Sequence, residues 1–221
     1  MRLQGLSIDD PSGRPLIERF SAEIFPGDWV LIVGDPSAAV TLFRAVARVW
    51  PWGSGRIALP AHTRVYFMPQ RPYLPSGPLR HALCYPDSGE GCSEEKATQV
   101  LSQVGLGYLA KRLYENAEWE DVLVLAEQQR FGFARLLMRR PDWIFIEDAT
   151  DALDEESEKE LLNLLDAEFP HATLMTISSH VALEAWHGRK MVLERNSAGV
   201  VVHEVNGKSS SEQAGQGTAK S

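Results

Sequence analysis

The chain has 221 residues, of which 44% are hydrophobic, so it can bury a core as one domain or as a domain with a subdomain. Its net charge of −8 argues against nucleic acid as the main partner, because duplex binding depends on Lys and Arg side chains that neutralise phosphates. The sequence holds no apolar run of 18 residues and does not open as a signal peptide does. We therefore expect any membrane role to come through a partner.

The cysteines are few. Cys84 and Cys92 are too few and too close together for a disulfide framework, and they lack the spacing of a zinc site. Their number and spacing predict a protein of the reducing cytosol.

The first third of the chain predicts short strands separated by turns. One helix is expected here, from about Val40 to Val49, because Leu42, Phe43 and Val46 recur at helical spacing before Pro51. The predicted strands are residues 2–8, 17–24, 30–33 and 64–68.

From about residue 76 to residue 140 the composition favours helices. Ser93 is a helix N-cap followed by acidic residues, and a long helix is expected from Glu127 to Arg139, before Pro141. These residues predict a helical subdomain.

Strands and helices alternate in the last third. Residues 143–147 are a continuous apolar strand that ends in carboxylates, and Asp154 caps a helix over residues 155–168. Alternation of this kind favours a three-layer α/β fold with a parallel sheet. Further strands are expected at residues 173–177, 189–193 and 199–204, and a disordered tail over residues 207–221.

The loop after the strand 30–33 has the position of a phosphate-binding loop but not its residues. A P-loop reads G-x-x-x-x-G-K-[ST], in which glycines let backbone N–H groups surround the phosphates and the lysine neutralises them. After Gly34 the chain reads DPSAAVT, with no second glycine and no lysine. The scaffold of a nucleotide site is present and its chemistry is missing.

Three segments together resemble the ATP-binding domain of ABC transporters: LFRAVARVWPWGSGRI, FMPQRPYLPSG, and the long run from VLVLAEQQR to IFIEDATDALDEESE. The stretches WPWGSGRI and QRPYLPSGPLRHALCYP resemble the branch of SbmA/BacA-like and peroxisomal fatty-acyl transporters. The resemblance covers about residues 3–205. It implies a P-loop NTPase-like α/β domain over residues 1–206, with a mainly parallel central sheet, an antiparallel β edge and a helical subdomain at about 76–140.

Domains of this family work as head-to-tail pairs, in which each ATP lies between the P-loop of one copy and the signature loop of the other. Phosphoryl transfer then depends on positioning and on charge stabilisation. The positions that the resemblance assigns are Gly34, Ser37, Thr41 and Leu42 in the P-loop, Gln70 in the Q-loop, Val124, Ala126 and Glu127 in the signature, Glu147 and Asp148 in Walker B, and Ser179 and His180 at the switch.

The departures from the family pattern fall on these chemical positions. Val124 replaces the signature serine and Ala126 replaces its glycine, while the two Walker B acids stand in reversed order. An ungapped match puts Ser179 at the switch histidine, with His180 one residue later.

Structural interpretations stand beside the functional ones. The acids at 147 and 148 are either a remnant metal site or a solvated strand end whose carboxylates cap the next loop. Gln70 is either a Mg²⁺ or coupling residue or a plain turn residue, and His180 is either a shifted switch or an exposed residue at the start of a helix.

We predict an ATP-binding domain of ABC-transporter type with little or no ATP binding and hydrolysis, a pseudo-ATPase. ATP and Mg²⁺ would bind weakly or not at all, the metal through Thr41, Gln70 and Glu147 if ATP binds. The alternatives are an active ATPase subunit that energises transport across a membrane, or a non-catalytic scaffold. The resemblance implies a membrane-spanning transporter domain and a second ATP-binding domain, the same or another, as partners, and a cytoplasmic location, including the cytoplasmic face of a membrane.

Overall fold

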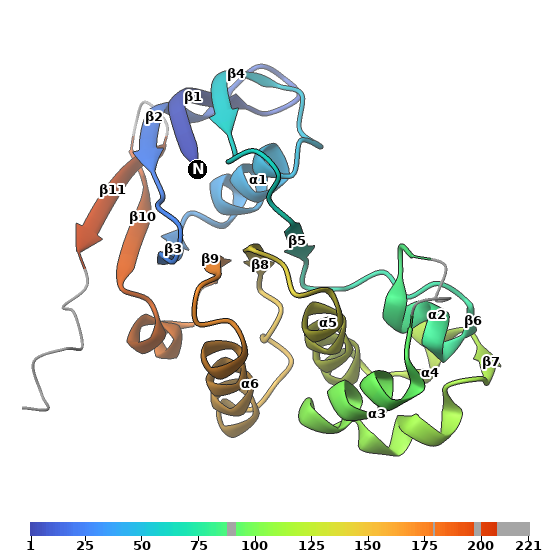
Figure 1. The fold of residues 1–221 in the computed structure, drawn as a ribbon. Coiled ribbons are helices and arrows are strands. Elements are labelled where there is room, and N and C mark those ends of the chain that lie inside the picture. The colour runs from blue at the N-terminus through green and yellow to red at the C-terminus, as the bar shows by residue number, and fades with distance from the viewer. Residues whose placement is uncertain (88–91, 179, 197–199, 207–221) are drawn as a thin grey trace, which may run out of the picture. The chain divides into compact units, whose positions relative to one another are not determined.

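The computed structural model describes residues 1–87, 92–178, 180–196 and 200–206 (Figure 1). They form two compact units: Met1–Ala58 together with the chain from Met175 onward, and Leu59–Leu174. The predicted switch residue Ser179 and the predicted tail from residue 207 lie outside the described residues.

Strands dominate the first unit. Its strands are β1 (Arg2–Asp9), β2 (Pro15–Glu23), β3 (Trp29–Gly34), β4 (Gly53–Ala58), β10 (Arg189–Arg195) and β11 (Val200–Asn206). An antiparallel sheet has the order β2-β1-β4, and β3 pairs in parallel with β10, which pairs antiparallel with β11. Val30, Leu31 and Ile32 of β3 are fully buried, which explains why this strand is a continuous apolar run.

The second unit is mostly helical. Its elements are β5 (Val65–Met68), β6 (Gly77–Pro78), α2 (Leu79–Cys84), α3 (Glu94–Gln103), the 3₁₀ helix η1 (Gly107–Arg112), β7 (Asn116–Ala117), α4 (Trp119–Val122), α5 (Leu125–Arg139), β8 (Trp143–Glu147) and α6 (Glu155–Glu168). β5 and β8 are parallel, and α2 and α3 both pack on α5 (Figure 1). Phe131, Phe133 and Leu136 of α5 are fully buried, so this helix is the core of the unit.

β9 (Thr173–Ile177) lies at the boundary of the two units and is followed by the 3₁₀ helix η2 (Val181–Trp186). In the second unit the N–H of Thr173 donates to the carbonyl of Asp142, before β8. In the first unit the N–H of Ser178 donates to the carbonyl of Ile32 in β3. The fold is mixed α/β with a mostly parallel central sheet and additional antiparallel strands, which confirms the predicted fold class.

The first helix differs from its prediction. α1 covers Pro36–Val46, so it begins four residues earlier and ends three residues earlier than expected. Asp35 is its N-cap and Pro36 its first residue, where a fixed φ is favourable and a missing N–H costs nothing. The expectation had followed apolar spacing alone.

β4 was also not predicted, because its sequence GSGRIA contains few apolar residues.

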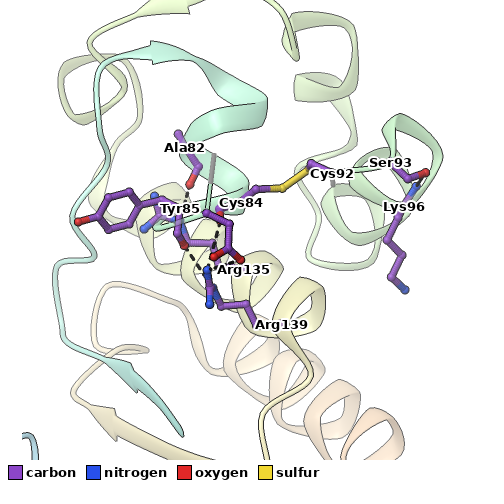
Figure 2. Close-up of a disulfide and its surroundings, with 9 residues drawn as sticks. Ala82, Cys84, Tyr85, Cys92, Ser93, Lys96, Arg135 and Arg139 are labelled. Atoms are coloured by element: carbon purple, nitrogen blue, oxygen red, sulfur yellow. Dashed lines mark hydrogen bonds and ion pairs between the residues drawn. A yellow bond between two sulfur atoms is a disulfide. The ribbon is translucent and has the colours of Figure 1, made fainter. Parts of the chain in front are cut away.

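Cys84 and Cys92 form a disulfide, so inferring a reducing compartment from their number and close spacing was wrong (Figure 2). Cys84 is the last residue of α2, and Cys92 precedes Ser93, the N-cap of α3. The two Cα atoms are 6.3 Å apart. Number and spacing in the sequence could not show this, because the fold brings the two helix ends together. The two cysteines therefore give no ground for a reducing compartment.

We expect a reductant to lower the free energy of unfolding by about 2–3 kcal/mol, because the bond closes a short loop that otherwise gains entropy in the unfolded chain. Urea unfolding with and without a phosphine reductant measures this. The matched control is the double variant Cys84→Ala/Cys92→Ala, whose stability should not respond to the reductant. Equal stability of the wild-type chain under both conditions would contradict the prediction.

Candidate functional site

Gly34 ends β3 with φ at +113°, a backbone conformation that favours glycine. A Cβ atom at this position would lie 2.2 Å from the carbonyl oxygen of Leu193 in β10. The loop therefore needs its first glycine for strand packing, whether or not a ligand binds there.

The start of α1 carries a carboxylate of the chain itself. Asp35 Oδ1 accepts a hydrogen bond from the backbone N–H of Ala38 at 2.9 Å, and Asp35 Oδ2 accepts one from Arg195 Nε at 2.6 Å. The N–H of Ser37 also interacts with this carboxylate, and Pro36 has no N–H. The bond from Arg195 is the main reason that the pKa of Asp35 lies below its ordinary value of 3.8. The donors of the first helical turn are therefore already used.

The other predicted loop residues have structural contacts. Thr41 is buried, and its Oγ1 donates to the carbonyl oxygen of Ser37 at 2.6 Å. Leu42 is fully buried in the core, whereas Ser37 is exposed. The Thr41 hydroxyl thus bonds within its own helix.

In the second unit, β8 ends in two half-buried acids. Glu147 is the last residue of the strand, and Asp148 follows in the left-handed region with φ at +43°. A non-glycine residue is uncommon in that region and is often found at functional sites. The Walker B role of these two acids stays a prediction.

Gln129 of α5 connects the loop after β5 with the loop after β8. It is fully buried, and its Nε2 donates to the carbonyl of Gln70 at 3.2 Å, to the carbonyl of Asp148 at 3.4 Å and to Asp151 Oδ1 at 2.5 Å. Its Oε1 accepts from the N–H of Ala152 at 3.1 Å. One amide therefore holds two loops in place.

The side chain of Gln70 takes part in the same arrangement. Its Nε2 donates to Asp151 Oδ2 at 2.5 Å. The carboxylate of Asp151 therefore accepts one hydrogen bond from the amide of Gln70 and another from the amide of Gln129. Gln70 is thus tied to the loop after β8 by its side chain and by its carbonyl. Its role as a Mg²⁺ or coupling residue stays a prediction.

The predicted signature residues lie at the start of α5. Val124 is the N-cap, 65% exposed, and has no side-chain acceptor to offer. Its N–H donates to Glu127 Oε2 at 3.1 Å, while Glu127 Oε1 accepts from the Tyr108 hydroxyl at 2.6 Å. Ala126 lies between them in the first turn. A carboxylate of the chain therefore also lies at this helix start.

At the predicted switch, Ser179 lies outside the described residues, and His180 is the half-buried N-cap of η2. The N–H of His180 donates to Ser178 Oγ at 3.2 Å. The buried histidine of this region is His187, whose ring bonds to the carbonyl of Leu183 at 2.7 Å and to Thr176 Oγ1 at 2.9 Å. Burial lowers the pKa of His187, in keeping with a neutral structural residue.

Sequence reasoning missed Arg195 and Asp151 as residues of these loops. Arg195 lies 160 positions from Asp35, so only the pairing of β10 with β3 brings them together. Asp151 stands directly before Ala152, Leu153 and Asp154, in the stretch IFIEDATDALDEESE that resembles the family, and this position was the one available signal.

Two further properties concern metal binding and membrane insertion. Over residues 1–87, 92–178, 180–196 and 200–206, no three His, Cys, Asp or Glu side chains gather as a metal-ion site requires. Within the same residues, every helix is too short or too polar to cross a membrane.

Comparison with known proteins identifies ABC transporter sequences. The chain is 35% identical over 192 residues to an ABC transporter ATP-binding protein of Haemophilus influenzae, with 86% of this chain and 32% of the relative covered. It is 33% identical over 177 residues to the inner membrane ABC transporter ATP-binding protein YddA of Escherichia coli, with 78% of this chain and 30% of the relative covered. It is 33% identical over 189 residues to ABC transporter D family member 1 of Arabidopsis thaliana, with 80% of this chain and 14% of the relative covered. The chain thus spans about a third, or less, of the length of these relatives.

The fold also matches a solved structure, that of a bacterial Atm1-family ABC exporter with ATP bound. The TM-score is 0.76 at 23% identity, over 87% of this chain and 36% of the other. No family model matches the chain. From the sequence relatives, the chain is a homologue of ABC transporter ATP-binding proteins, including D-family members, and it has the fold seen in the exporter.

We expect Asp35→Ala to lower the free energy of unfolding by about 1 kcal/mol, because α1 loses its N-cap, and Asp35→Asn to lower it less, because Asn also caps helices. The wild-type chain should have a higher free energy of unfolding than Asp35→Asn above pH 3.8. This difference should disappear as the pH falls through the folded-state pKa of Asp35, which lies below 3.8. Urea unfolding between pH 2 and 7 measures both. An advantage that grew on acidification would contradict the assigned bond to Arg195.

We expect Gln129→Leu to lower the free energy of unfolding by about 2–4 kcal/mol, because the N–H of Ala152 and the carboxylate of Asp151 lose a partner. The matched control is Gln99→Leu on the exposed face of α3, which should change stability by less than about 0.5 kcal/mol. Chemical unfolding of both variants provides the comparison. Similar losses in the two variants would show that the amide of Gln129 has no special role.

Proposed function

We propose that the chain is the ATP-binding-type domain of an ABC transporter in which the nucleotide site no longer binds or hydrolyses ATP effectively. In this role it keeps the fold and the surfaces of the domain for assembly. The observation that carries the proposal is the carboxylate of Asp35 at the start of α1, bonded to Ala38 and Arg195.

A phosphate at this helix start would meet a negative charge instead of open donors. Helix N-termini bind anions through free N–H groups and the positive end of the helix dipole. Here Pro36 offers no donor, and the N–H groups of Ser37 and Ala38 interact with Asp35. The guanidinium of Arg195, a possible cation for a phosphate, is bonded to the same carboxylate. These residues do not fit a triphosphate.

Magnitudes support the same conclusion. A hydrogen bond to a charged group contributes about 1.5–3 kcal/mol, so the missing lysine and two or three missing loop donors remove about 4–8 kcal/mol. Micromolar binding corresponds to about −8 kcal/mol and millimolar binding to about −4 kcal/mol. Even the smaller loss moves ATP to the millimolar range.

The residues that would polarise water and contact the γ-phosphate also fit poorly. The hydroxyl of Thr41 donates within α1 and the amide nitrogen of Gln70 donates to Asp151, and both side chains keep an oxygen that could bind Mg²⁺. Asp148 is one methylene shorter than a glutamate, and a displacement near 1 Å costs about 10²-fold in rate. Val124 presents methyl groups where a hydroxyl would meet a phosphate.

The ATP-binding domains of this family are cytoplasmic, dimerise and work with a membrane domain. We infer that this chain lies at the cytoplasmic face of a membrane and binds a transporter membrane domain and a second ATP-binding domain, either a copy of itself or a competent partner. Co-purification from solubilised membranes tests this. Recovery of neither kind of partner would remove the assembly role.

Calorimetry with Mg-ATP tests the nucleotide proposal. We expect the wild-type chain to show a Kd above about 1 mM, and a variant in which a glycine-rich, lysine-containing P-loop replaces residues 35–40 to bind at least tenfold more tightly. The same loop with alanine in place of the lysine is the matched control. Circular dichroism confirms folding in each case.

Two results would overturn the proposal. Micromolar binding by the wild-type chain would mean that the present loop binds phosphates after all. Hydrolysis at about 1 s⁻¹ or faster, a usual rate for enzymes, would make the chain an active ATPase.

A further inference from the structure

The disulfide between Cys84 and Cys92 joins two helix ends that the rest of the chain holds unequally (Figure 2). Cys84 is the last residue of α2, and Cys92 directly precedes Ser93, the N-cap of α3. The two cysteines are 9% and 8% exposed, so the bond is nearly covered in the folded chain. A reagent in solution therefore reaches a sulfur only where one of the two helix ends opens.

The end of α2 is fixed by two arginines of α5. Arg135 is buried, and its Nε donates to the carbonyl of Ala82 and its Nη1 to that of Tyr73, both at 2.6 Å. Ring faces lie beside the same guanidinium, so its partners here are neutral groups. These contacts hold the last turn of α2 on α5.

Arg139 holds the residues that follow. Its Nε donates to the carbonyl of Tyr85 at 3.2 Å and its Nη2 to that of Cys84 at 3.3 Å. The same Nη2 forms an ion pair with Asp87 at 2.9 Å. The Cys84 side of the disulfide thus stays in place whether or not the two sulfurs are joined.

The start of α3 is held more loosely. Ser93 is exposed, and its Oγ accepts from the N–H of Lys96 at 3.4 Å, which is long for a hydrogen bond. A further contact of this turn, from the Tyr114 hydroxyl to Glu94 Oε2 at 2.7 Å, is exposed to water. Helix ends fray, and such local opening needs less free energy than global unfolding. We therefore expect fraying of this turn to uncover the sulfur of Cys92.

Apolar contacts keep both helices on α5 without the bond. Leu79 and Leu83 of α2 are fully buried, as are Val100 and Leu101 of α3. Both helices pack on α5. This burial does not depend on the disulfide, so the reduced chain should stay folded, with the change confined to the start of α3.

Location supplies the reagent. Disulfides are rare in the cytosol, where small thiols keep cysteines reduced, and those found there are usually transient or redox-sensing. The ATP-binding domains of this family are cytoplasmic. A disulfide in such a domain is therefore expected to exchange with small thiols. The site depends on the function proposed above only through that location.

We propose that Cys84 and Cys92 form a reversible redox site for a small thiol of the glutathione class, and that reduction frees the first turn of α3 from α2 while the fold remains. In this role the bond is a switch rather than a permanent support.

The exchange proceeds in two steps. A glutathione thiolate attacks the sulfur of Cys92, which breaks the bond to Cys84 and forms a mixed disulfide, and the Cys84 thiolate takes up a proton. A second glutathione thiolate attacks the glutathione sulfur of the mixed disulfide, and the Cys92 thiolate leaves and takes up a proton. Two glutathione molecules are thereby oxidised to glutathione disulfide, and the protein bond gains their two electrons. The reverse exchange with glutathione disulfide restores the bond.

Alkylation of the native chain in glutathione buffers measures the state of the bond. The sequence contains only these two cysteines, so the number of labels found by mass spectrometry reports on this pair alone. We expect two labels in millimolar reduced glutathione and none after an excess of glutathione disulfide is added. A native chain that stays unlabelled in the reduced buffer, but takes two labels in urea, would have a closed structural bond and overturn the proposal. Two labels under every condition would also overturn it.

Two N-cap variants identify the opening that admits the thiol. Ser93→Ala removes the cap beside Cys92 and should raise the rate of reduction about fivefold, the usual effect of a lost N-cap on an equilibrium. Asp154→Ala is the matched control, because Asp154 caps α6 of the same unit and its loss lowers global stability to a similar extent. It should leave the rate unchanged. Equal acceleration in both variants would mean that the thiol enters through global unfolding, against the proposal.

NMR locates the structural response to reduction. We expect the backbone amide signals of residues 94–97 to shift or broaden, whereas those of residues 131–137 in α5 keep their positions. The double variant Cys84→Ala/Cys92→Ala should resemble the reduced chain and should not respond to glutathione. An unchanged start of α3, or changes that extend through α5, would overturn the proposed release.

All three measurements use the purified full chain and need no nucleotide or partner. Their failure would leave the nucleotide and assembly proposals untouched, and micromolar ATP binding, which would overturn the nucleotide proposal, would change none of these expectations.

Discussion

The start of α1 is the position on which the chemistry of the first unit depends. The first turn of a helix leaves N–H groups without partners, and they bind either a ligand or an acceptor of the chain. Here the acceptor is Asp35, and Arg195 of β10 compensates its charge. The contact is intramolecular, so a phosphate would have to displace a carboxylate that is always present. The same residue caps the helix that begins at Pro36, so one side chain both stabilises α1 and occupies the start of the helix.

The framework survives the changed residues because its hydrogen bonds come from other side chains. Gln129 bonds to backbone groups of two loops and to Asp151. Backbone groups must be satisfied whatever the loops bind, so the fold requires this amide even without a ligand. The signature positions Val124 and Ala126 provide no such bond through their side chains. The hydrogen bonds that hold the two loops therefore do not depend on the side chains at these two positions.

The sequence predicted elements that depend on local pattern. The strand of residues 143–147 and the helix of residues 155–168 have the predicted bounds, because a buried strand is continuously apolar and Asp154 is a strong N-cap. Contacts between distant residues were not predictable. The bond of Asp35 to Arg195 depends on which strand lies beside β3, and the disulfide depends on where α2 ends and α3 begins. The uncompensated charge of Arg135 was equally hidden, since an arginine in an apolar helix gives no sign of its partners.

Asp35 and Arg135 show two ways in which this chain compensates a charged side chain that is removed from water. Both are charged, and both lie beside groups that attract the opposite charge. Asp35 has its cation within the chain, so the first loop needs no ligand to be electrostatically complete. Arg135 has carbonyl oxygens and ring faces as partners among the described residues, so neutral groups of the chain, and not a counter-ion, stabilise its charge.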